Sequence, residues 1–247
     1  MAKKLTPIER KIIKLEAFSS NLSKKLSIRQ KALLDQRLNT ISAKLDEVIM
    51  AETTFAANAK TIELNTLVRA EFNNLTQLQV AEVDTLLSKV YNNTRGSISK
   101  DLGVTFDVTN DYQLSELKKR MVDGSTFSQR LYQNNAAVSE RINNDIGRLL
   151  YQQASPTDIK RALVKNFNIS WNAADRLIRT ETSKFYNAAA QDSYRAAGVT
   201  QIEWLTEADD KTCEICGPLD GQRFPVGGIS APAHPNCRCT VLPVIED

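Results

Sequence analysis

The chain has 247 residues, of which 42% are hydrophobic and 25% charged, and its formal net charge is +3. This composition fits a soluble protein of one or two domains. A net charge so close to zero does not by itself indicate a highly charged partner. No run of about 18 apolar residues occurs, so the sequence predicts neither a membrane-spanning helix nor a membrane partner. The first residues also lack the apolar core of a signal peptide. We therefore expect a reducing compartment, where clustered cysteines favour metal binding over disulfides.

Residues 1–95 are predicted to form a long helical arm. Between Pro7 and Gly96 the sequence has neither proline nor glycine, the residues that interrupt helices most readily. Apolar residues recur there at steps of three and four, which indicates one buried helical face. Two or three long, coiled-coil-like helices are expected over residues 8–93, with candidate bends at Thr53-Thr54 and Asn73-Asn74. The pattern does not decide between a hairpin and an extended coiled coil.

The beginning of the arm is strongly basic. Against Glu9 and Glu16, residues 1–31 carry Lys3, Lys4, Arg10, Lys11, Lys14, Lys24, Lys25, Arg29 and Lys31. One interpretation is a contact with DNA or an acidic partner. The other is a solvated helix face, which is favoured because the charges are not regularly interleaved with aromatic residues as in a base-stacking platform.

Residues 96–124 are expected to connect the arm to the rest of the chain. Gly96 and Gly103 provide breaks, and residues 104–108 alternate weakly, as in a short strand. A short helix is predicted from about Tyr112 to Val122, before Gly124.

Residues 125–198 are predicted to form a central helical domain. Ser125 or Thr126 suits the cap of a helix that reaches about Gln153. Ser155 and Pro156 begin a second helix, which ends near Asn166. A third helix, capped by Ser170, is expected to end at Gly198, the residue that most easily adopts a left-handed conformation.

The composition changes after Gly198. Residues 199–247 contain all four cysteines and five of the seven prolines, and residues 202–205 and 239–244 are predicted strands. From residue 207 onward there are too few large apolar residues for an independent core, so a bound metal would have to contribute folding free energy. The expected fold is mainly α, with long N-terminal helices, a central helical domain and a small zinc-binding α+β knob with short strands.

Candidate metal ligands gather in the knob. Cys213 and Cys216 have the Cys-x2-Cys spacing that directs two thiolates at one ion, and His234, Cys237 and Cys239 follow. Zinc takes four sulfur or nitrogen ligands, so one of the five candidates is in excess. The preferred set is Cys213, Cys216 and His234 with either Cys237 or Cys239, between which spacing does not choose.

Other interpretations of this cluster are weaker. A redox Cys-x2-Cys pair would need a following helix in a βαβ unit, and two disulfides would need an oxidising compartment. A catalytic zinc keeps a position open for water, whereas surplus thiolates favour a closed structural site. Because His234 is the only histidine, general acid–base chemistry has few candidates. We therefore expect no enzymatic activity.

A second motif, Arg179-Thr180-Glu181-Thr182, lies in the helix before the knob. Neighbouring residues on a helix point in different directions, so Arg179 and Glu181 need not pair. We expect them to satisfy polar groups where the helix packs against the knob. Catalysis by Glu181 is the alternative.

Several segments, in order, carry a resemblance to a known family. They are residues 123–134, 155–159, 179–182, 204–221 (which begins at Trp204) and 232–239. Over about residues 120–245 the chain resembles the phage Mu F-like minor head proteins. The resemblance implies a low-copy virion component inside the capsid, made in the host cytoplasm. It also implies association with the portal protein and with other capsid or scaffold proteins, in head assembly, DNA packaging or DNA ejection.

The arm lies outside the resemblance, so its role follows from its pattern alone. It would attach the protein to a partner or join copies of the chain. The alternative function is a DNA-binding protein that holds the genome, or is ejected with it, through the basic residues of the arm. Toxin fusions of this domain occur in the family, but nothing in this sequence indicates a second catalytic module.

Overall fold

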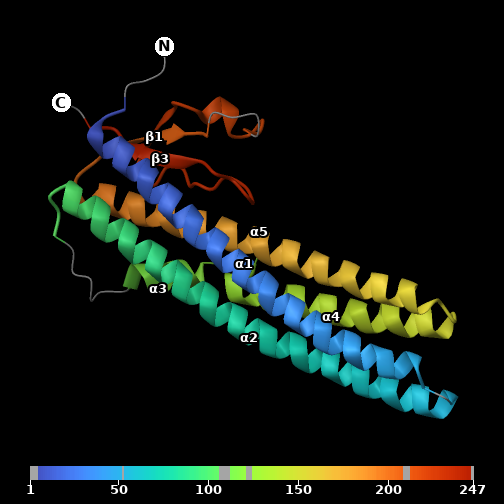
Figure 1. Ribbon diagram of the computed structural model, residues 1–247. Helices are drawn as coiled ribbons and strands as arrows, with labels where there is room; N and C mark the ends of the chain where they lie inside the picture. Colours follow the sequence, from blue (N-terminus) through green and yellow to red (C-terminus); the bar gives the residue numbers. More distant parts are fainter. Residues whose placement is uncertain (1–4, 52, 106–111, 121–123, 208–211, 246–247) are drawn as a thin grey trace. The chain divides into compact units, whose positions relative to one another are not determined.

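The computed structural model describes residues 5–51, 53–105, 112–120, 124–207 and 212–245. Within these residues the chain is mainly helical, as predicted, with a small antiparallel sheet near its C-terminal end (Figure 1). The elements in chain order are α1 (Pro7–Ile49), α2 (Thr54–Asp101), α3 (Tyr112–Lys119), α4 (Phe127–Tyr151), α5 (Pro156–Ala196), β1 (Gln201–Leu205), η1 (Gly217–Leu219), β2 (Arg223–Pro225) and β3 (Thr240–Pro243).

The chain forms two compact units, each assembled from separate stretches of sequence. The site unit comprises residues 1–26, 83–120 and 176–247, and the bundle unit comprises residues 27–82 and 121–175. Because α1, α2 and α5 each contribute to both units, the sequential segments expected from the sequence (1–95, 96–124, 125–198 and 199–247) do not coincide with the compact units.

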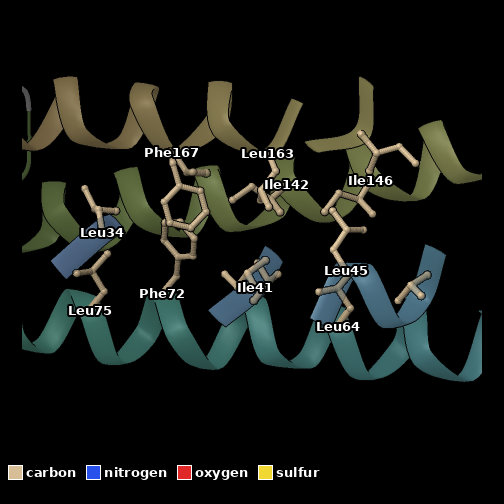
Figure 2. Close-up of a cluster of buried hydrophobic side chains, with 14 residues drawn as sticks. Leu34, Ile41, Leu45, Leu64, Phe72, Leu75, Ile142, Ile146, Leu163 and Phe167 are labelled. Atoms are coloured by element: carbon tan, nitrogen blue, oxygen red, sulfur yellow. The ribbon is translucent and has the colours of Figure 1, made fainter. Parts of the chain in front are cut away.

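The core of the bundle unit is apolar and is built by four helices. Figure 2 shows its side chains meeting between α1, α2, α4 and α5: Leu34, Ile41, Leu45, Leu64, Phe72, Leu75, Ile142, Ile146, Leu163 and Phe167. The rings of Phe72 and Phe167 pack with their centroids 5.4 Å apart and tilted by 58°, a favourable aromatic arrangement. The steps of three and four in the sequence therefore mark a face that is buried within the same chain.

Ion pairs show that α1 and α2 form a hairpin in this unit. Arg37 pairs with Glu71 at 3.5 Å, and Lys44 pairs with Glu63 at 2.7 Å. Residue numbers rise along one helix as they fall along the other, so the two helices are antiparallel. The predicted bend at Thr53-Thr54 falls where the break between them ends, since Thr54 is the first residue of α2, but α2 continues without interruption through Asn73-Asn74.

A polar group of side chains is buried in the same unit. Asn135 donates from Nδ2 to Thr76 Oγ1 at 2.9 Å and to Gln79 Oε1 at 2.6 Å. Ser170 donates in turn to Asn135 Oδ1 at 3.3 Å. Because buried polar groups need partners, these bonds disfavour any other register of α2, α4 and α5.

Two predicted breaks are wrong for the same physical reason. The connector was expected to begin at Gly96, yet α2 runs through it to Asp101. A helical glycine costs about 1 kcal/mol, and burial of Tyr91 and Ile98 on α2 offsets this cost. The predicted boundary between Asn166 and Ser170 is also absent, because the Ser170 hydroxyl bonds to Asn135 inside the bundle instead of capping a helix.

Other local predictions have clear outcomes. Thr126 caps α4 in a capping box with Gln129, and Gly198 follows α5 with φ +75, as expected. The start of the short helix at Tyr112 is confirmed. Of the strand predicted at 104–108, the first two residues lie outside any strand, and residues 106–108 lie outside the described part of the chain.

Candidate metal centre

The knob is held on one face of α5. Its sheet has the order β2-β1-β3, both pairs antiparallel, with Trp204 fully buried on the central strand. Tyr194 donates its hydroxyl to the carbonyl of Val241 at 3.0 Å, and Gln191 donates to the carbonyl of Ile229 at 3.2 Å. Spacings of three and four place such residues on one helix face. Polar side chains on one face of α5 thus hold the knob through hydrogen bonds to its backbone.

The same face of α5 also contacts the cysteine cluster directly. Asn187 Nδ2 donates to the carbonyl of Cys239 at 3.4 Å, and its Oδ1 accepts from the hydroxyl of Thr240 at 3.0 Å. These contacts fix the backbone at the start of β3. We did not predict Asn187, Gln191 or Tyr194 from the sequence, and the available signal was a series of polar residues on the face that the helix buries.

The five predicted ligands come together from two short segments. Cys213 and Cys216 precede η1, while His234, Cys237 and Cys239 precede β3. The Nε2 atom of His234 lies 3.1 Å from Cys213 Sγ and 3.3 Å from Cys216 Sγ, and Cys216 Sγ lies 3.6 Å from Cys237 Sγ. The ligand atoms form two groups of three that share Cys216, each within 4.8 Å.

This donor set fits a tetrahedral metal ion. Zinc bonds of about 2.3 Å to sulfur and about 2.0 Å to nitrogen correspond to ligand–ligand edges of about 3.5–3.8 Å, near the contacts of the cluster. The Nδ1 atom of His234 lies 2.9 Å from the carbonyl of Pro235. Since a carbonyl can only accept, Nδ1 carries the proton and Nε2 presents its lone pair to the cysteines, as in metal-binding histidines.

The thiols do not share one environment. A hydrogen bond from the Cys239 thiol, opposed by burial, lowers the pKa of Cys237 to about 5, and the same bond raises the pKa of Cys239. A backbone N–H of Cys216 lowers the pKa of Cys213, whereas burial raises that of Cys216 to about 12. All four cysteines are free thiols. Thiolates are the form that binds metals, so the cluster can bind a metal ion.

The Arg179–Thr182 motif borders this centre. The backbone N–H of Asn236, inside the ligand loop (residues 234–239), donates to Thr180 Oγ1 at 3.1 Å, and the Thr180 hydroxyl donates to the carbonyl of Arg176 at 2.7 Å. Glu181 is buried and pairs with Lys184 at 3.2 Å. A packing role was expected of Arg179 and Glu181, and Thr180, which lies between them, makes a hydrogen bond to the knob.

The basic residues of the arm are distributed over both units. In the site unit Lys11 pairs with Asp101 at 2.5 Å, and in the bundle unit Arg29 pairs with Glu82 at 2.6 Å and Lys31 lies over the ring of Trp171. Lys3 and Lys4 lie outside the described residues. The side chains that are exposed on α1 include Arg10, Lys14, Lys24 and Lys25.

Within the described chain, no helix combines the length and apolarity that a membrane span requires.

Comparison with known proteins adds two findings. Residues 140–242 match the family described as Phage Mu protein F like protein. The chain is also 25% identical over 167 residues to the NAD(+)--arginine ADP-ribosyltransferase EFV of Enterococcus faecalis (strain ATCC 700802 / V583). That alignment covers 60% of this chain and 34% of the relative, so the chain spans about a third of the relative's length. No solved structure matches the chain.

Proposed function

Through residues 140–242 this chain belongs to the phage Mu protein F-like family, and from that premise we propose that it acts in phage head morphogenesis. The observation that supports this best is the extent of the match. It includes all of α5, the whole candidate metal-ligand cluster and the hydrogen bonds that join them. The match therefore extends far beyond a short motif.

The finer proposal is a low-copy minor capsid protein, associated with the portal inside the capsid and needed for head assembly, DNA packaging or DNA ejection. The apolar stripe of α1 and α2 is buried by α4 and α5 in the bundle unit. The outer faces of the hairpin, which expose Ile28, Phe55 and Ile62 beside charged residues, are therefore the surfaces that would contact the portal, a capsid or scaffold protein, or a second copy of the chain.

Phage that lack the gene test this proposal. Particles made without the protein should package or deliver less DNA, and the protein should cross-link to the portal protein in intact particles. Complementation with the full chain should restore both properties. Particles of unchanged number, DNA content and infectivity would overturn the proposal.

We further propose that the cluster holds a structural zinc ion. The ligands would be Cys213, Cys216, His234 and one of the remaining two cysteines, with Cys237 preferred because its Sγ lies 3.6 Å from Cys216 Sγ. A bound zinc would contribute folding free energy to the knob. His234 already uses Nδ1 for Pro235 and faces two cysteines with Nε2, so it is poorly placed to act as a general base.

Metal content of the purified protein tests the ligand set. One zinc per chain is expected, with loss in Cys213→Ser and Cys237→Ser and retention in Cys239→Ser. Loss in Cys239→Ser with retention in Cys237→Ser would reverse the choice of the fourth ligand. Full zinc content in Cys213→Ser would contradict the site itself.

We also propose that the protein has no enzymatic activity. The relative is an ADP-ribosyltransferase, so the appropriate assay is NAD⁺ consumption with an arginine acceptor. No turnover above buffer is expected, and turnover that depends on the protein would refute the proposal.

DNA binding by α1 is the second candidate function. At about 100° per residue, Arg10, Lys14 and Lys25 lie within an arc of about 60° on α1, and all three are exposed. Replacing these three residues with glutamine should weaken DNA binding and reduce its salt dependence. If the salt dependence of DNA affinity does not change, this face of α1 is only exposed to solvent and does not contact DNA.

A further inference from the structure

A cavity of about 260 Å³, lined mainly by polar and charged residues, lies in the site unit between α1, α5 and the ligand loop. Small-molecule sites are usually larger than this and mostly apolar. Among the described residues that line this cavity, none is leucine, isoleucine, valine, methionine or phenylalanine. Both properties favour a small, charged ligand over an apolar one.

Positive charge reaches the cavity from three segments. Lys24 comes from α1, Arg179 from α5 and Arg238 from the ligand loop. Two acidic residues also line it: Glu207, which pairs with Arg238 at 2.5 Å, and Glu16. Burial, reinforced by Glu207, raises the pKa of Glu16 to about 7. The Glu16 carboxyl therefore carries only part of a charge near neutral pH, and the balance is positive.

Hydroxyl groups complete the lining. Thr182 is 2% exposed, and its Oγ1 atom has no hydrogen-bond partner among the described residues. Ser19, Ser20, Ser23 and Ser183 also line the cavity. A buried hydroxyl without a partner is unfavourable and commonly marks the position of a bound ion, water or ligand.

We propose that this cavity binds a phosphate group, with Lys24 and Arg179 attracting its charge and Thr182 and Ser183 donating hydrogen bonds to its oxygens. Guanidinium, ammonium and hydroxyl groups together are the usual protein partners of phosphate oxygens. The shared chemistry is that of free phosphate and of the DNA backbone. The proposal goes beyond head morphogenesis, since it would hold or fail whether or not the protein acts in assembly.

Titration calorimetry of the full chain with inorganic phosphate, at constant ionic strength, tests the proposal. Arg179→Gln and Thr182→Val should each weaken binding about tenfold, the effect of losing one hydrogen bond to a charged group. Thr182→Val removes a hydroxyl that has no partner among the described residues, so this variant should fold normally. Arg176→Gln, which changes an exposed arginine of the same helix outside the cavity, is the matched control and should bind like the parent protein.

Parallel titrations with a short DNA duplex distinguish the two sources of phosphate. If both cavity variants weaken DNA binding as they weaken phosphate binding, the natural ligand is a backbone phosphate. If only inorganic phosphate is affected, the ligand is a free anion. Circular dichroism and metal content should match the parent in every variant. No binding at about 10 mM phosphate, or equal weakening in Arg176→Gln, would overturn the proposal.

Discussion

Glu16 gives the sharpest prediction about stability. Burial, followed by the charge of Glu207, raises its pKa in the folded protein from 4.5 to about 7. Between these two values the folded state binds more protons than the unfolded state, so stability falls as pH rises. A difference of about 2.5 pKa units at about 1.4 kcal/mol per unit sets an upper limit of about 3.5 kcal/mol, reached above pH 7.

The variant Glu16→Gln removes this titration. It should unfold with a free energy similar to the parent near pH 4.5 and about 2–3 kcal/mol higher near pH 8. Urea unfolding across this pH range measures the difference, and Glu140→Gln, at an exposed position of α4, controls for the loss of a carboxylate. A difference that does not change with pH, or a less stable Glu16→Gln protein at pH 8, would refute the reasoning.

Three further substitutions test the fold by urea unfolding. Thr126→Ala removes the cap of α4 and should cost about 1 kcal/mol, whereas Thr126→Ser should cost little. Asn135→Leu leaves the polar atoms of Gln79 and Ser170 without their partner and should cost about 2–3 kcal/mol. Phe72→Ala opens a cavity in the bundle core and should cost about 3–5 kcal/mol. An unchanged unfolding midpoint in Thr126→Ala, Asn135→Leu or Phe72→Ala would contradict the contacts described for that residue.

Helices were predictable where the signal was local and repeated. The periodic apolar face of the arm, the cap at Thr126 and the stop at Gly198 are properties of short segments, and the structure has all three. The errors at Gly96 and Ser170 have a different origin. Both residues weaken a helix by intrinsic propensity, but distant side chains stabilise the helix around them, and no local pattern reports those contacts.

The same distinction applies to the candidate metal site. Its candidate ligands lie in two short segments with spacings typical of metal ligands, so Cys213, Cys216 and His234 could be selected from the sequence alone. The residues that hold these segments in place could not. Asn187 and Tyr194 act across more than forty positions, and a polar residue on a helix does not reveal which distant carbonyl it will meet.

One hydrogen bond links the Arg179–Thr182 motif of α5 to the ligand loop. Asn236 lies between His234 and Cys237 and has φ 61, a left-handed conformation that asparagine tolerates better than most residues. In that conformation its N–H meets the hydroxyl of Thr180, so the loop is tied to the helix between two of its ligands. The Arg179–Thr182 motif and the ligand cluster are therefore parts of one structure. A metal ion bound by the loop would also stabilise the packing of the knob on α5, because both depend on the same turn.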